Sequence, residues 1–155
     1  MAESGAWIMD LDSQLQAAVG DREMLHVIQA PELFSVPLSP PYCRHVLIWQ
    51  DHILPLMDLA AWLNGQSERR EHKVAGILAF QPRRDQEVRY GALSLAATPI
   101  RAQVDDQQAC DLPAHPSGWK RLALSCFQQG NRIIPILDLP TLFSDALTKA
   151  SRVRS

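Results

Sequence analysis

Short apolar runs, each broken by charge, proline or glycine, cover most of the 155-residue chain. Runs of this length between turn residues are typical of β-strands. The expected strands span residues 7–12, 14–19, 46–49, 53–57, 73–80, 88–96 and 122–128. Polar turns between neighbouring strands predict hairpins around Asp12-Ser13, Gln50-Asp51, Gln129-Gly130-Asn131 and the charged segment 81–87. The pattern therefore predicts a mainly β protein.

One segment occurs twice, the second copy starting 80 residues after the first (52 to 132). Residues 52–63 read HILPLMDLAAWL and residues 132–143 read RIIPILDLPTLF. Each copy fits a strand that runs into a short helix, because an Asp after the strand can accept hydrogen bonds from the first free helical N–H groups. Asp58 and Asp138 are the predicted N-caps. The repeat predicts two halves of similar build.

The strands of the two copies carry a proline each. Pro55 and Pro135 cannot donate to a sheet ladder, so we expect each proline at an edge or a bulge of its sheet. In the strand before the second copy, alternation places Leu122, Leu124 and Cys126 on one face. We expect that face to be buried, which makes Cys126 a small core residue.

Residues 21–29 are predicted to form a short helix that ends before Pro31, because the residue before a proline disfavours the helical region. Loops are predicted at 65–72 and at 103–118, where polar residues and prolines gather. An apolar stripe from Leu139 to Leu147 predicts a C-terminal helix.

Composition narrows the class of protein. Hydrophobic residues make up 46% of the chain, which is enough for a core without disulfides or metal. The net charge of −2 favours neither nucleic acid as a partner nor an anionic membrane surface. No apolar run is long enough to insert into a membrane, and no signal peptide is recognisable. Three cysteines without CxxC spacing fit reduced thiols. These features predict a cytoplasmic protein.

Motifs for catalysis are absent from the sequence. It contains no GxxxxGK[ST], GxGxxG or GxSxG, and its five histidines lack metal-ligand spacing. We therefore expect no enzyme activity, no cofactor and no metal. One alternative stays open: Cys43 and His45, two residues apart, would share a face of a strand and serve a small-molecule sensor or a thiol enzyme.

Residues 36–65, VPLSPPYCRHVLIWQDHILPLMDLAAWLNG, resemble the signature region of CheW-like domains. In that region a Val-Pro and a later Pro precede a strand, a tight turn and an aliphatic-Pro-aliphatic-x-Asp-Leu segment. The matching positions are Val36, Pro37, Pro40, Val46, Ile53, Pro55, Asp58 and Leu59. Residues 129–143 are similar to the final strand and helix of these domains, and residues 7–28 resemble their first two strands and first helix.

The resemblance implies a mainly β fold of two five-stranded SH3-like β-barrel subdomains, with a few short helices and a C-terminal helix. Residues 1–155 would form a single domain of two intertwined halves, with signatures at 36–65 and 121–147. It further implies a non-enzymatic adaptor in chemosensory signal transduction. The expected partners are a CheA-type histidine kinase, chemoreceptor cytoplasmic tips and other CheW-like domains, with recruitment to membrane receptor arrays or a cell pole.

The candidate partner-binding residues are Trp49, Gln50, Asp51, His52 and His26. CheW-like domains usually carry Arg-Gly where this chain has Gln50-Asp51, and commonly carry a Glu in the first helix where it has His26. Replacing both members of a charge pair is compatible with a stable fold and an altered surface. The alternative function is therefore a divergent CheW-like module that docks on a different motility, pilus or polar-localisation system. Trp49 fits a core position as well as an interface anchor.

Overall fold

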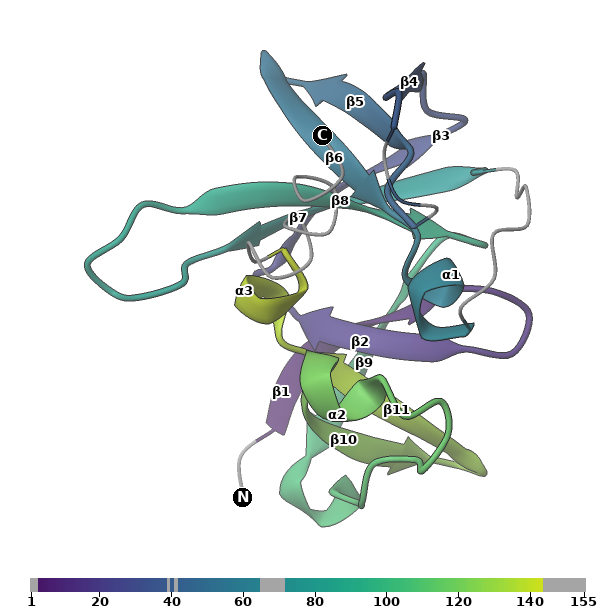
Figure 1. Ribbon diagram of the computed structural model, residues 1–155. Helices are drawn as coiled ribbons and strands as arrows, with labels where there is room; N and C mark the ends of the chain where they lie inside the picture. Colours follow the sequence, from purple (N-terminus) through teal and green to yellow (C-terminus); the bar gives the residue numbers. More distant parts are fainter. Residues whose placement is uncertain (1–2, 39, 41, 65–71, 144–155) are drawn as a thin grey trace.

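Two β-sheets form most of the computed structural model, which describes residues 3–38, 40, 42–64 and 72–143 (Figure 1). The five-stranded sheet has the order β10 (Ala123–Gln129), β11 (Arg132–Leu137), β2 (Gln16–Gly20), β1 (Glu3–Asp10) and β9 (Ile100–Asp105). The six-stranded sheet has the order β3 (Met24–Gln29), β7 (Val74–Phe80), β8 (Arg89–Leu95), β6 (His52–Met57), β5 (His45–Trp49) and β4 (Phe34–Ser35).

Short helices accompany the sheets. They are α1 (Leu59–Asn64), the 3₁₀ turn η1 (Asp106–Gln108), α2 (Trp119–Leu122) and α3 (Leu139–Leu142). The prediction of a mainly β fold with a few short helices is confirmed. The expectation of five strands in each half is wrong for the six-stranded sheet, because the short β4 adds to the edge of β5. Closure of each sheet into an SH3-like barrel stays a prediction.

Both copies of the sequence repeat form a strand, a cap and a helix. The Asp58 carboxylate accepts a hydrogen bond from the Ala61 N–H at 3.2 Å, and the Asp138 carboxylate accepts one from the Thr141 N–H at 3.4 Å. The predicted caps are thus confirmed. The helices that they start, α1 and α3, lie between the two sheets (Figure 1).

The prolines of the repeat lie in interior strands, so the prediction of a sheet edge is wrong, although Pro135 adjoins the register shift in the β10–β11 pair. β6 lies between β8 and β5, and β11 lies between β10 and β2. Each strand accommodates its proline because it pairs with a second neighbouring strand only at residues after the proline. The pairing of β6 with β8 starts at Leu56, and β11 pairs with β2 at Ile136. Pro55 and Pro135 immediately precede these positions, so each missing N–H lies before the second ladder begins.

The predicted helix at 21–29 is also wrong, because residues 24–29 form β3, antiparallel to β7. The two β-branched residues of this segment face opposite sides. Val27 packs against the core shared by both sheets, whereas Ile28 packs against the core of the six-stranded sheet. Apolar side chains on two opposite sides suit a strand and not a helix.

The segment before the second copy differs in part from the prediction. β9 extends into the predicted loop 103–118, and Leu122 belongs to α2. A register shift between Ala123 and Ser125 turns Leu124 outward, where 68% of it is exposed. Cys126 is buried as predicted. The remaining predicted loop, 65–71, and the predicted helix beyond residue 143 lie outside the described residues.

The largest core cluster joins the two sheets. It combines buried residues of β1, β2, β6, β7, β8 and β11 with those of all three α-helices, among them the indole of Trp119. The helices also contact one another: Trp62 lies so close to Gly118 that an added Cβ would approach the ring to 2.5 Å. The Arg121 guanidinium stacks over the same ring at 5.8 Å. This packing joins α2 to α1, into which the base of the β5–β6 hairpin continues.

Candidate protein-interaction surface on the β5–β6 hairpin

The β5–β6 hairpin ends in a two-residue turn with an uncommon backbone. Trp49 and His52 form the last ladder pair, and between them Gln50 and Asp51 have φ angles of 48° and 66°. Two positive φ angles in a two-residue loop are typical of a type I′ turn, which matches the twist of the strands. Neither residue is a glycine, so side chains project from both turn positions, and both are exposed.

Three aromatic rings gather beside this turn. The Trp49 ring stacks on His52 with centroids 6.4 Å apart, and Tyr90 of β8 lies 5.6 Å from Trp49 and 5.1 Å from His52. Trp49 is half-buried and packs against the core of the six-stranded sheet, whereas His52 is exposed. Trp49 thus packs against the core and also contacts the exposed His52 at the tip.

An apolar stripe follows the outer face of the same strands. Ile48 and Ile53 are directly opposite each other, with 58% and 71% of each exposed. Phe34 of β4 pairs with Val46 of β5 on this face and is 44% exposed. We define Phe34, Val46, Ile48 and Ile53 as the outer stripe. Cross-strand apolar pairs that remain in water are candidates for a protein contact.

The outer stripe was missing from the residues selected in the sequence, although a signal for it is present. Leu47 and Leu54 fill the core, so the intervening positions Ile48 and Ile53 must face outward. On a strand with one solvated face, these positions are usually polar. An apolar residue there breaks the alternation and marks the outer face.

His26 does not join the aromatic cluster. It lies exposed on β3, and in the sheet order β7 and β8 stand between β3 and β6. Among the described residues, the ring contacts of Trp49 and His52 are with each other and with Tyr90. Of the five selected residues, Trp49, Gln50, Asp51 and His52 therefore lie together at the hairpin tip, and His26 lies apart from them.

The pair Cys43 and His45 has features that argue against a nucleophilic thiol. Cys43 precedes β5, so the two residues are not on one face of a strand. Burial raises the pKa of the Cys43 thiol, which disfavours the thiolate that a nucleophile needs. The His45 ring packs edge-on against His72, with centroids 5.3 Å apart, and the His72 Nδ1 lies 2.6 Å from the Ser94 hydroxyl.

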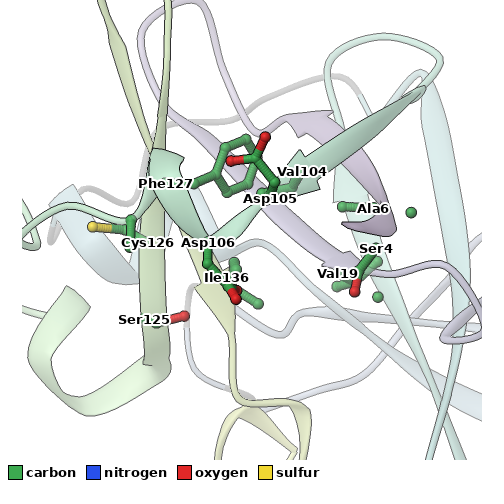
Figure 2. A pocket seen from close by; sticks show the side chains of 13 residues that line it. Ser4, Ala6, Val19, Val104, Asp105, Asp106, Ser125, Cys126, Phe127 and Ile136 are labelled. Atoms are coloured by element: carbon green, nitrogen blue, oxygen red, sulfur yellow. The ribbon is translucent and has the colours of Figure 1, made fainter. Parts of the chain in front are cut away.

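A cavity of about 240 Å³ lies in the other half of the molecule. It opens between β1, β2, β9 and β10, and its wall is mainly apolar, with Phe127 extending from β10 toward the strand that carries Val104 (Figure 2). Asp105 on the rim caps η1 through the Gln107 N–H. Its carboxylate thus has a structural role.

A metal-binding cluster and a membrane-spanning helix are both absent from the described ranges. No group of three or more His, Cys, Asp or Glu side chains there is arranged to hold a metal ion. No described helix has the length and apolar character needed to cross a membrane.

Comparison with known proteins defines the family. A family model for the CheW-like domain matches residues 8–147. The chain belongs to the CheW-like domain family. CheW-like domains are a family of non-enzymatic scaffolds or adaptors of chemotaxis. A comparison of this CheW-like chain with curated proteins gives no match.

The fold of this CheW-like chain is similar to that of a solved scaffold protein. The crystal structure of scaffolding protein TtCheW from Thermoanaerobacter tengcongensis superposes with a TM-score of 0.69 at 12% sequence identity. The alignment covers 93% of this chain and 90% of the other. At this identity the likeness concerns the fold, and the surface of the β5–β6 hairpin has to be judged from its own residues.

Proposed function

We propose that this chain is a cytoplasmic adaptor that binds a CheA-type histidine kinase and the cytoplasmic tips of chemoreceptors through the β5–β6 hairpin. Other CheW-like domains are further partners, and the complex forms at membrane receptor arrays or a cell pole. The chain works as one domain of two intertwined halves and carries no cofactor. The observation that carries the proposal is the exposed Ile48–Ile53 pair beside the side chains at the turn.

Physical chemistry supports this surface as a binding site. The outer stripe offers apolar area at its centre, and Gln50, Asp51 and His52 offer polar groups at its end. An apolar centre with a polar rim is the usual composition of a protein interface. The packed base of the hairpin holds this surface in place before a partner arrives, which lowers the entropy lost on binding.

The test measures binding of the purified chain to the regulatory domain of a CheA-type kinase, and separately to a receptor tip, from the same organism. Ile53→Lys places a charge in the outer stripe, and we expect it to weaken binding about tenfold or more. Ile133→Lys is the matched control, because Ile133 is the equivalent residue of the second copy and is 43% exposed. Circular dichroism establishes that both variants are folded.

Equal affinity of the two variants would remove the hairpin surface from the proposal. Failure of the unmodified chain to bind both the kinase domain and the receptor tip would overturn the proposed partners.

A second function is favoured by the charge at the turn. Asp51 places a carboxylate at the exposed tip, where the Arg-Gly typical of the family would place a guanidinium, and His26 replaces the common Glu. This supports a divergent module that docks on a different motility, pilus or polar-localisation system. The triple variant Gln50→Arg, Asp51→Gly, His26→Glu should then gain kinase binding that the natural chain lacks. No gain would count against this second function.

A further inference from the structure

We propose that Cys110 and Cys126 form a redox modification site, in which a peroxide converts the two thiols into a reversible disulfide. The two Sγ atoms lie 3.2 Å apart, and all three cysteines are free in the structure. This inference concerns a different region from the β5–β6 hairpin and is independent of the proposed partners.

The backbone holds the two cysteines opposite each other. Ala109 and Phe127 form an antiparallel bridge, and the next residues on either side are joined by a hydrogen bond from the Cys110 N–H to the Cys126 carbonyl at 3.2 Å. Residues opposite each other in an antiparallel pair have Cα separations compatible with disulfide geometry. Only a small adjustment of the side chains is needed to bring the sulfur atoms to bonding distance.

The surroundings give the two thiols different roles. Cys126 is buried in β10, and desolvation together with its contact to the neighbouring Cys110 thiol raises its pKa to about 12. Its S–H donates to the Cys110 carbonyl oxygen at 2.8 Å. Cys110 is only partly buried, so a small oxidant can reach it. We therefore assign Cys110 as the thiol that reacts first and Cys126 as the thiol that resolves the product.

The reaction balances with hydrogen peroxide as the oxidant. The Cys110 thiolate attacks one peroxide oxygen: an S–O bond forms, the O–O bond breaks, and the leaving hydroxide takes up a proton to become water. Cys126 Sγ then attacks the Cys110 sulfur, so that an S–S bond forms and the S–O bond breaks. The second hydroxide leaves as water with the Cys126 proton. Two thiols are oxidised and one peroxide is reduced to two waters.

The disulfide would link the two sides of the contact between Ala109–Cys110 and Cys126–Phe127, which we call the seam. β9 and β10 are the two edge strands of the five-stranded sheet, and η1 with Ala109 and Cys110 connects β9 back to β10. The seam is otherwise held by the Ala109–Phe127 bridge, the backbone hydrogen bond between Cys110 and Cys126, and the hydrogen bond from the Gln108 side chain to the Gln128 carbonyl at 3.3 Å. Cys126 also belongs to the wall of the cavity in Figure 2. Oxidation would therefore restrict the movement of that wall.

The test treats the purified chain with hydrogen peroxide, blocks remaining thiols with an alkylating reagent under denaturing conditions, and determines the intact mass and the linked peptides. We expect one alkylated thiol, Cys43, a link between Cys110 and Cys126, and three alkylated thiols after reduction with dithiothreitol. Cys43→Ser, the matched control, should keep the link. Hydrogen exchange at residues 105–110 should slow on oxidation, because the disulfide suppresses opening of the seam.

Variants in which one of the two cysteines is replaced by serine test the order of the two steps. In Cys126→Ser, dimedone should label a sulfenic acid at Cys110, whereas in Cys110→Ser it should leave Cys126 unlabelled. Three alkylated thiols in the peroxide-treated natural chain, or a link that includes Cys43, would overturn the site. Since these outcomes are measured on the natural chain, they hold even if a variant fails to fold.

Discussion

The β5–β6 and β10–β11 hairpins are two versions of one element, and they differ mainly at their tips. At the base, each hairpin has a proline one residue before its second strand begins to pair with a further strand of the sheet. Each also has an Asp that caps a helix. At the tip, the turn residues Gln50-Asp51 correspond to Gly130-Asn131, and the ladder pair Trp49–His52 corresponds to Gln129–Arg132. The outward pair Ile48–Ile53 corresponds to Gln128–Ile133.

This difference indicates which positions are constrained by folding. The base of each hairpin packs into a core cluster, so its sequence is restricted by volume and by hydrogen bonding. The exposed side chains of the tips extend beyond the core, where replacements cost little stability, whereas Trp49 also packs against the core of the six-stranded sheet. An aromatic and aliphatic tip on one copy and a polar tip on the other therefore points to a role in binding for the first.

The largest effect on stability is expected at the base, and it should be equal in the two hairpins. Leu54 and Ile134 are equivalent residues, each buried in the core of its own sheet. Leu54→Ala and Ile134→Ala should each lower the free energy of unfolding by about 2–5 kcal/mol, because both leave a cavity. Urea unfolding measures both values. A large loss for one variant and none for the other would refute the equivalence of the bases.

A smaller effect on stability is expected at the tips, and it should differ between the two hairpins. Trp49→Ala removes a half-buried ring with two aromatic neighbours and should cost about 2 kcal/mol of stability. Gln129→Ala, at the equivalent exposed position, should change stability by less than about 0.5 kcal/mol. Equal values in urea unfolding would mean that Trp49 contributes nothing beyond an ordinary surface residue.

The smallest effect concerns the first residue of each turn. Gln50 has a φ of 48° and its counterpart Gly130 has a φ of 60°, a region where side chains are strained. Gln50→Gly should raise stability by about 1 kcal/mol, and the reciprocal Gly130→Gln should lower it by about the same amount. Changes of the same sign in thermal unfolding would show that another contact determines the turn.

Local patterns in the sequence predicted the repeated hairpins and their caps because the determining groups are close along the chain. An Asp is followed three residues later by the N–H that it accepts from, so Asp58 and Asp138 are recognisable without tertiary information. The grouping of residues at the hairpin tip was predicted in part for the same reason. The turn and Trp49 adjoin each other, whereas Tyr90 comes from a distant strand.

The wrong predictions concern segments whose structure is determined by residues that are distant in the sequence. Residues 24–29 carry no strong local preference, and it is β7 that makes them a strand. Pro55 lies in an interior strand because the pairing of β6 with β8 begins only at the next residue, which the sequence alone does not reveal. The outer stripe was missed because the residues that bury Leu47, and so turn Ile48 outward, come from other strands.

The strand order also has a consequence for synthesis of the chain. Ala18 of β2 pairs with Ile136 of β11, so its partner is made 118 residues later (136 minus 18). By then the strands β3 to β8, residues 24–95, have left the ribosome and can pair with one another. The β1–β2 hairpin meanwhile presents an unpaired edge to whatever is near it. A growing chain of this protein is therefore most open to wrong pairing at its oldest strands, and the last hairpin to emerge protects the first.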